Sequence, residues 1–420
     1  GKIFDRFGII EGTKLFNGMF SIVAKNGTNV YLVRDRYGIK PIYYTYIGNH
    51  LYWSSEIKAF TNHPEFKSEV DESALREYLL YQNIISDRTL FKGVKLLPPG
   101  SIYICKHSAY KKYWEPVFSN EKMDFNEASE EVKRLLKKAV ERQLNCDVKI
   151  AQFLSGGVDS TIIRKIAGDK INHTITAGYV DGKSEHQIAW RNSAKMHTLE
   201  MFNSNSIKEY IFETIYHLED LRAGASYSNY ALYKKINMTG ETVVMQGTGG
   251  DELFGGYTHR YDSSKDYRSI LNRNKYYDDN EIEWNNDSLS NRMHFDFRHF
   301  MHGILLVGDK LSMAHTLEDR VPFLDNDLVD FALKIPPSMK QDKWILKHAF
   351  IDMIPSEVVN APKWGFTSPE HIWMDKNKDW IGSQLKNVWQ IIDKPKKNPN
   401  YSLTWSLLSL EYWLKHYIVK

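Results

Sequence analysis

Residues 150–160 read Ile-Ala-Gln-Phe-Leu-Ser-Gly-Gly-Val-Asp-Ser, and this stretch decides the fold. Ile150, Phe153 and Leu154 form a short apolar run that is typical of a buried parallel strand. The run ends at two glycines, and the residues from Val158 onward predict a helix. A strand, a glycine turn and a helix N-terminus together make an anion site, because glycines let the backbone approach a phosphate and free N–H groups point at it.

The polar side chains of this loop suit a nucleotide. Ser155, Ser160 and Thr161 add hydroxyl donors, and Asp159 is able to hold a magnesium ion against phosphate oxygens. No Lys follows the glycines of Ser-Gly-Gly-x-Asp-Ser, so the pattern is not a Walker loop. It resembles the pyrophosphate loop of ATP pyrophosphatases, which cleave ATP between the α- and β-phosphates. The alternative is a plain glycine turn, but all six residues behind a hydrophobic strand favour the nucleotide site.

A second strand end repeats this design. Thr242–Gln246 predicts a strand, and Gly-Thr-Gly-Gly-Asp-Glu follows it at residues 247–252. In a doubly wound parallel sheet, ligands bind at the carboxyl ends of the strands, so the two loops are expected to face each other across a nucleotide. Asp251 is then placed to share magnesium with Asp159. The alternative for the acidic pair alone is a solvated first turn of a helix.

Composition excludes several classes of function. The 420 residues, 42% of them hydrophobic, suit two or three folded domains, and a net charge of +3 gives no reason to expect nucleic acid or an anionic membrane. Cys105 and Cys146 are the only cysteines, which excludes a disulfide framework and a CxxC site. Apolar clusters such as 304–307 are too short to span a bilayer, and no signal peptide is recognised. We therefore expect a cytoplasmic protein.

Two parts of the chain differ in pattern. Residues 1–115 are β-rich, with hairpins over 20–33 and 42–53, a helix over 72–81 capped by Asp71, and a strand over 101–105. After a polar linker at 116–125, strands and helices alternate through residues 126–420, which predicts an α/β, doubly wound parallel sheet. The helices expected there cover 126–143, 185–197, 206–218, 227–236 and 294–314, a further strand covers 173–180, and 267–291 is a polar excursion.

Three segments of the first part carry a resemblance, Asn17–Phe20, Arg34–Pro41 and Ser54–Lys58. They look like the second half of the Ntn-type glutaminase lobe of glutamine-hydrolysing asparagine synthetases. The resemblance implies a nucleophilic N-terminal Cys and glutamine-binding residues upstream of Asn17. This sequence lacks them, so we expect a partial lobe that does not hydrolyse glutamine by itself. Taken alone, Arg34-Asp35 indicates a structural turn pair.

The remainder resembles the synthetase domain of the same family, most closely at 308–310 and 312–325. Asp309, Arg320 and Asp325 are interpreted there as buried ion-pair partners. The fold implied is an ATP-pyrophosphatase domain of the adenine nucleotide alpha hydrolase-like type. Two further stretches, 363–366 and 405–417, match the family and are expected to cover the core.

Carried over by motif, the resemblance implies a set of site residues. Magnesium would be held by Asp159 and Asp251. A Lys-x-x-Lys motif supplies Lys340 and Lys343, of which the first would neutralise charge on the leaving pyrophosphate. ATP would be bound by Leu154, Ser155, Gly156, Gly157, Asp159, Ser160, Ala177, Gly247 and Gly249.

The implied chemistry has two steps. A substrate carboxylate attacks the α-phosphate of ATP, and ammonia then attacks the acyl-adenylate and displaces AMP. Asparagine synthetases usually carry Glu or Asp where this chain has Thr248, and a hydroxyl does not accept a proton at neutral pH. Either Glu219 or Glu252 serves instead, or the acceptor is not aspartate.

We therefore predict an ATP- and Mg²⁺-dependent amide ligase, with aspartate as the default substrate. Its partners are small molecules, namely a carboxylate with ammonia or glutamine, and a separate glutaminase or a second copy of the chain is a further candidate. Three alternatives stay open. They are a related ligase acting on a sugar acid or closing an amide ring, a non-catalytic nucleotide-binding homologue, and another pyrophosphatase-loop enzyme, which the missing CxxC disfavours.

Overall fold

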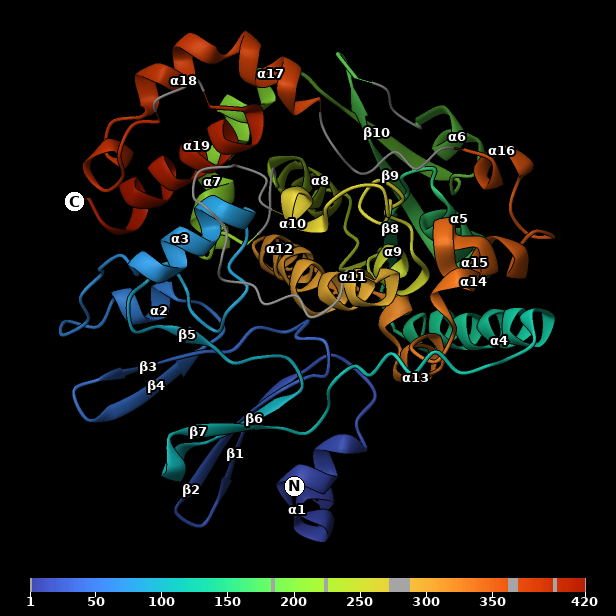
Figure 1. Ribbon diagram of the computed structural model, residues 1–420, viewed down its shortest axis with the longest axis horizontal. Coiled ribbons are helices and arrows are strands. Elements are labelled where there is room, and N and C mark those ends of the chain that lie inside the picture. The colour runs from blue at the N-terminus through green and yellow to red at the C-terminus, as the bar shows by residue number, and fades with distance from the viewer. Residues whose placement is uncertain are drawn as a thin grey trace.

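The computed structural model describes residues 2–182, 186–222, 226–271, 288–361, 369–395 and 399–419. These residues form two antiparallel sheets and one parallel sheet. In Figure 1 the antiparallel strands lie together at the bottom of the view, and the parallel strands lie at the upper right. None of the described helices is long and apolar enough to cross a membrane.

The first part of the chain holds both antiparallel sheets. The larger has the strand order β1-β2-β6-β7 and the smaller β4-β3-β5. Both predicted hairpins and the predicted helix are confirmed, and the Asp71 carboxylate accepts the N–H of Ala74 at 3.0 Å to cap that helix. The elements are α1 (Lys2–Lys14), β1 (Ser21–Asn26), β2 (Asn29–Arg34), β3 (Tyr43–Ile47), β4 (His50–Ser54), α2 (Lys58–Thr61), α3 (Glu72–Tyr81), β5 (Lys95–Leu96), β6 (Ser101–Ile104) and β7 (Ala109–Lys112).

The turn after β2 is held by side chains. Asp35 accepts the main-chain N–H groups of Ile39 and Lys40, both at 3.0 Å. Arg34 donates to the carbonyl oxygens of Gly38 at 2.7 Å and Lys40 at 2.9 Å. Both charged side chains are fully buried, so the structural interpretation of this pair is confirmed.

The second part is built on the parallel sheet, whose strand order is β10-β9-β8-β11-β12. Helices α4, α5 and α15 pack in one apolar cluster, and α7, α8, α12 and α19 pack in the other, so both faces of the sheet are covered. The predicted doubly wound α/β fold is confirmed. The strands are β8 (Ile150–Phe153), β9 (Ile171–Tyr179), β10 (Met196–Phe202), β11 (Val243–Met245) and β12 (Glu318–Arg320).

Three of the five helices predicted in this part, 126–143, 206–218 and 227–236, are found within a residue at both ends, whereas the one predicted over 294–314 is divided into α11, a π-turn and α12. The helices of this part include many that were not predicted. They are α4 (Phe125–Gln143), α5 (Val158–Ala167), α6 (His186–Arg191), α7 (Ser206–Leu218), α8 (Tyr227–Asn237), α9 (Gly250–Phe254), α10 (Tyr267–Leu271), α11 (Leu289–Phe295), α12 (Met301–Met313), α13 (Asn326–Ala332), α14 (Pro337–Lys340), α15 (Trp344–Ala349), α16 (Ser356–Val359), α17 (Glu370–Lys376), α18 (Lys378–Gln384) and α19 (Tyr401–Tyr417). A π-turn, Asp296–Phe300, joins α11 to α12.

Two predictions were wrong in detail. The helix predicted over 185–197 ends at Arg191, and the edge strand β10 begins at Met196. Residues 318–320 form a further strand, β12, where no strand was predicted. Most of the polar excursion at 267–291 and the family stretch at 363–366 lie outside the described residues.

Two ion pairs join the two parts of the chain, one of them largely buried and the other at the surface. Lys40, just after β2, contacts Asp309 on α12 at 2.7 Å, and Arg36 contacts Asp330 on α13 at 3.0 Å. Asp325 is paired with Arg142 of α4, so Asp309 and Asp325 are buried ion-pair partners as predicted. Arg320, the third, pairs with Glu318 at 2.7 Å nearer the surface. The domain boundary at 116–125 stays a prediction.

Candidate active site

The Ser-Gly-Gly loop follows β8 as a tight turn into α5. Gly156 has a φ of +89°, a conformation that favours glycine, and Gly157 caps the helix. The hydroxyl oxygens of Ser155 and Ser160 lie 3.0 Å apart, and the N–H of Gly157 donates to Ser155 Oγ at 3.3 Å. The loop therefore presents a helix N-terminus and two hydroxyls at the carboxyl end of the sheet, as an anion site requires.

The second loop packs directly against the first. A Cβ atom on Gly247 would lie 2.8 Å from Cβ of Asp159, and one on Gly250 would lie 2.7 Å from its Cγ. Gly249 has a φ of +97°. Glycines are thus required here for close approach of the two strand ends and not only for the turn.

Three charged side chains converge between the loops. The ammonium of Lys343 contacts the carboxylates of both Asp159 and Asp251, the second at 2.5 Å. Burial lowers the pKa of Lys343, but the two carboxylates outweigh it and raise the pKa above its ordinary value. The two carboxylates thus lie together, from opposite loops of the sheet, and their role as magnesium ligands stays a prediction.

An unusual backbone carries this lysine. Asp342 and Lys343 have φ values of +53° and +60°, so two successive non-glycine residues are left-handed. Each such residue costs about 1–3 kcal/mol and persists only where the surroundings enforce it. The two lysines of the motif therefore do not lie on one continuous α-helix, because α14 ends at Lys340 and α15 begins at Trp344.

The other lysine of the motif lies elsewhere. Lys340 is fully buried, its Nζ lies 5.2 Å from the centre of the Phe118 ring, and no hydrogen-bond partner for it is found among the described residues. Burial lowers its pKa to about 7. The cation at the two carboxylates is thus the second lysine of the motif, whereas the sequence assigned the phosphate contact to the first.

The remaining predicted residues line the strand ends. Leu154 follows β8, Ala177 lies on β9, and both are buried. Thr248 is half-buried in the second loop between Gly247 and Gly249. These positions are compatible with an adenosine between the strands, and the roles assigned to them stay predictions.

Glu219 and Glu252, the two acids considered as the base in place of Thr248, differ in their contacts. Glu219 forms an ion pair with Lys310, and its carboxylate accepts the main-chain N–H groups of Ile57 at 3.0 Å and Lys58 at 2.8 Å. Glu252 accepts the Tyr257 hydroxyl at 2.7 Å, and its burial beside Asp251 raises its pKa to about 7. Glu219 therefore joins parts of the fold, and only Glu252 lies next to the proposed metal-binding loop.

One residue of the site, Gly256, was not predicted from the sequence. A Cβ atom on Gly256 would lie 1.9 Å from Asp251 Oδ1 and 2.3 Å from Lys343 Cε. The sequence does show a Gly-Gly pair at 255–256 directly after α9. That pair belongs to no nucleotide-loop motif, so it did not indicate a site residue.

Gly256→Ala is expected to lower the rate of ATP-dependent synthesis about 10²-fold, because the added methyl group must displace Asp251 and Lys343 by about 1 Å. The matched control is Gly382→Ala in α18, where a Cβ meets nothing within 4 Å. Initial rates of AMP release by both variants test this. Equal rates would show that the contact at Gly256 is unimportant.

The donor set suits magnesium. Mg²⁺ prefers hard oxygen ligands and is usually held by one or two carboxylates together with substrate phosphates. Asp159 and Asp251 supply two carboxylates already gathered round one cation. Among the described residues no group of three or more His, Cys, Asp or Glu could hold a metal ion.

The fold and this loop pair define a class of protein, the ligases with an ATP-pyrophosphatase loop. Residues 131–415 match the asparagine synthase family, and residues 2–114 match the glutamine amidotransferase domain family. The chain belongs to the asparagine synthase family.

Named relatives agree with this assignment. The chain is 28% identical to asparagine synthetase (glutamine-hydrolyzing) 1 of Bacillus subtilis, covering 88% of this chain and 71% of the relative. It is 26% identical to asparagine synthetase (glutamine-hydrolyzing) 3 of the same organism, covering 87% and 70%. A solved glutamine-dependent NAD+ synthetase from Acinetobacter baumannii aligns at 14% identity over 59% of this chain and 63% of that one, with a TM-score of 0.21, too low to support an argument.

Membership of this family establishes the type of reaction that the protein catalyses. The protein is an ATP-dependent ligase that forms a carbon–nitrogen amide bond, with glutamine or ammonia as the nitrogen source. Its substrates are small molecules, ATP among them.

Proposed function

We propose that the protein is an asparagine synthetase, which converts aspartate, ATP and ammonia or glutamine into asparagine, AMP and pyrophosphate. The observation that carries this proposal is the meeting of Asp159, Asp251 and Lys343 between two glycine-lined strand ends. A site of this kind binds the β- and γ-phosphates at one end and leaves the α-phosphate for attack.

In this proposal each group has a distinct task. The N-terminus of α5 and the hydroxyls of Ser155 and Ser160 bind phosphate oxygens. Asp159 and Asp251 hold Mg²⁺, which supplies charge neutralisation to the leaving pyrophosphate when it is bound. Lys343 stabilises the negative charge that develops as the inner bond breaks, because a buried fixed cation needs no reorganisation during the reaction.

The sequential chemistry is argued from the reacting groups. A carboxylate oxygen is a poor leaving group, so the aspartate side chain must first be adenylated. The oxygen of aspartate attacks the α-phosphorus, pyrophosphate leaves, and the nitrogen of ammonia then attacks the activated carbonyl with loss of AMP. Tight packing of the two loops excludes water from the acyl-adenylate.

A first experiment mixes the protein with ATP, Mg²⁺, aspartate and an ammonium salt, and a parallel one replaces ammonium by glutamine. The expected products are AMP and pyrophosphate in equal amounts, together with asparagine. ADP as the product would overturn the proposal. The glutamine arm measures whether this chain uses that donor unaided.

Thr248 supports one second candidate, an amide ligase acting on another carboxylate. The acid that usually stands at this position is replaced by a hydroxyl, and the replacement lies in the second loop of the site. A pyrophosphate-release screen across amino acids and sugar acids separates the candidates, since only the true acceptor stimulates release. No stimulation by any acceptor, with no exchange of labelled pyrophosphate into ATP, would indicate a non-catalytic nucleotide-binding homologue.

The proposal also covers the cellular compartment, the domain boundary and the assembly of the enzyme. Cys105 and Cys146 are unpaired thiols, which agrees with a reducing compartment, the cytoplasm. We place the domain boundary in the linker 116–125, and we propose a homodimer or a separate glutaminase as the assembly to test by gel filtration.

A further inference from the structure

A buried carboxyl group that the mechanism above does not use lies beside the second loop. Asp319 is on β12, and its side chain accepts a hydrogen bond from Gln246, the residue directly before Gly247 and Thr248. Asp319 is 5% exposed, and its Oδ1 has no hydrogen-bond partner in the part of the chain that the structure describes. Such a polar atom is expensive to bury without a partner, so a ligand that donates hydrogen bonds is favoured.

The neighbours of Asp319 come from four elements. Gln246 at the end of β11 also donates to the Tyr233 hydroxyl of α8, at 3.2 Å. On α12, a Cβ atom at Gly308 would lie 2.6 Å from Asp319 Oδ2, so only glycine admits the carboxylate there. Lys40 and Asp309 act on it electrostatically, and Lys40 belongs to the glutamine amidotransferase part of the chain.

This cluster contains two carboxyl groups, those of Asp309 and Asp319, beside one ammonium, that of Lys40. Lys40 is already paired with Asp309 at 2.7 Å, so no cation is paired directly with Asp319 among the described residues. Burial raises the pKa of Asp319 to about 7, while hydrogen bonds from Gln246 and Tyr233 and the charge of Lys40 lower it and Asp309 raises it. A carboxyl group with these neighbours is able to take up or release a proton near neutral pH.

The chemistry of the nitrogen donor calls for such a group. Amines are largely protonated at neutral pH, and an ammonium ion has no lone pair with which to attack a carbonyl carbon. Thr248, in the position where the family usually places an acid, is unable to accept the proton. Resting on the proposed function, we propose that Asp319, supported by Gln246 and Tyr233, binds the ammonium ion and accepts its proton before the attack on the acyl-adenylate.

The step balances without any further reactant. One N–H bond of ammonium breaks, its electron pair stays on nitrogen, and the proton forms an O–H bond with Oδ1 of Asp319. The neutral ammonia then forms the new C–N bond while the bond to AMP breaks, and the second proton that the nitrogen must lose leaves with AMP and passes to solvent. Asp319 returns its proton to solvent between turnovers.

The test variant is Asp319→Asn, which keeps the shape of the side chain and an oxygen for the Gln246 hydrogen bond. With ammonium chloride as donor, amide formation is expected to fall about 10²-fold. With hydroxylamine, which is largely unprotonated at neutral pH, hydroxamate formation is expected to persist. Equal losses with the two donors would overturn the inference.

A half-reaction separates this inference from the proposed function. Exchange of labelled pyrophosphate into ATP with aspartate needs no amine, so Asp319→Asn is expected to retain it. Loss of exchange in this variant alone would overturn the inference in favour of a structural role. Absence of exchange in the unmodified protein would instead overturn the proposed function.

Two neighbouring variants predict opposite shifts in the pH profile. Tyr233→Phe removes a hydrogen bond that stabilises the Asp319 carboxylate. The acid limb of the pH–rate profile for ammonium-dependent synthesis therefore moves to higher pH. Asp309→Asn removes a repelling negative charge, so the limb moves to lower pH. Limbs that do not move in these directions would contradict proton acceptance by Asp319.

Discussion

Lys343→Met is expected to lower the rate of ATP-dependent amide formation about 10³-fold, the largest effect on activity that the structure predicts. Its ammonium is the group on which Asp159 and Asp251 converge. Under the proposed function, the change removes the fixed positive charge assigned to the leaving pyrophosphate, and it leaves the two carboxylates near each other without that cation. Pyrophosphate release at saturating ATP and aspartate measures the loss.

Lys340→Met is the matched control, because it removes a second buried lysine from the same motif. Lys340 has the ring of Phe118 as its neighbour and no carboxylate near it. The loss of rate in Lys343→Met is expected to exceed that in Lys340→Met at least about tenfold. The reverse order would support the assignment made from the motif spacing and would refute the one made from the geometry.

Local patterns predicted much of the fold correctly. The Asn-Gly turn of the first hairpin, the Asp71 cap and the helix at 206–218 each depend on neighbouring residues, and each is found as predicted. The Ser-Gly-Gly loop was likewise recognisable, because a strand, a glycine turn and a helix start occur within eleven residues. Such features are set by neighbouring residues, so tertiary contacts did not change the local structure that the sequence predicts.

Other features depended on contacts distant in sequence. Strand β10 shows no regular alternation of exposed and buried residues, with Met196, Leu199 and Met201 exposed, and it is a strand because β9 pairs with it. Strand β12 is similarly specified by pairing with β11. The sequence did not distinguish Lys340 from Lys343, since the distinction depends on two successive left-handed residues at 342–343, a conformation that non-glycine residues adopt uncommonly.

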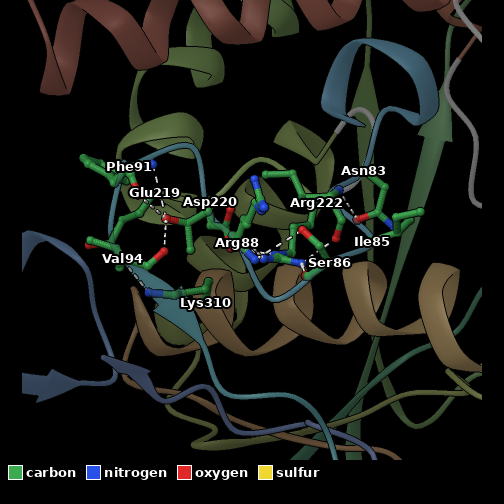
Figure 2. Close-up of polar contacts among 12 residues, drawn as sticks. Asn83, Ile85, Ser86, Arg88, Phe91, Val94, Glu219, Asp220, Arg222 and Lys310 are labelled. Carbon is green, nitrogen blue, oxygen red and sulfur yellow. Dashed lines mark hydrogen bonds and ion pairs between the residues drawn. The ribbon is translucent and has the colours of Figure 1, made fainter. Parts of the chain in front are cut away.

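Glu219→Gln is expected to lower the free energy of unfolding by about 3–5 kcal/mol, the largest effect on stability that we predict. Figure 2 shows Glu219 together with its ion-pair partner Lys310 of α12. Glu219 is fully buried, and its partner Lys310 is 2% exposed, so the substitution leaves a buried ammonium without its counter-charge. Urea denaturation followed by tryptophan fluorescence measures the change.

The pH dependence of this contribution has a definite sign. Burial raises the pKa of Glu219, but Lys310 and Lys58 outweigh it and hold the pKa below the ordinary value of 4.5. A carboxylate whose pKa is depressed on folding stabilises the protein above its unfolded pKa, and the contribution is lost as the pH falls below 4.5. The stability difference between the unmodified protein and Glu219→Gln is therefore expected to shrink in acid.

Two further variants show whether the buried pair itself is responsible. Glu69→Gln removes an exposed partner of Lys92, and it is expected to leave stability unchanged because solvent screens that pair. The double variant Glu219→Gln with Lys310→Met removes the stranded ammonium and is expected to recover part of the loss. Recovery is incomplete because the N–H groups of Ile57 and Lys58 still lose a charged acceptor. A single Glu219→Gln variant as stable as Glu69→Gln would show that Glu219 does not join the two parts of the chain energetically.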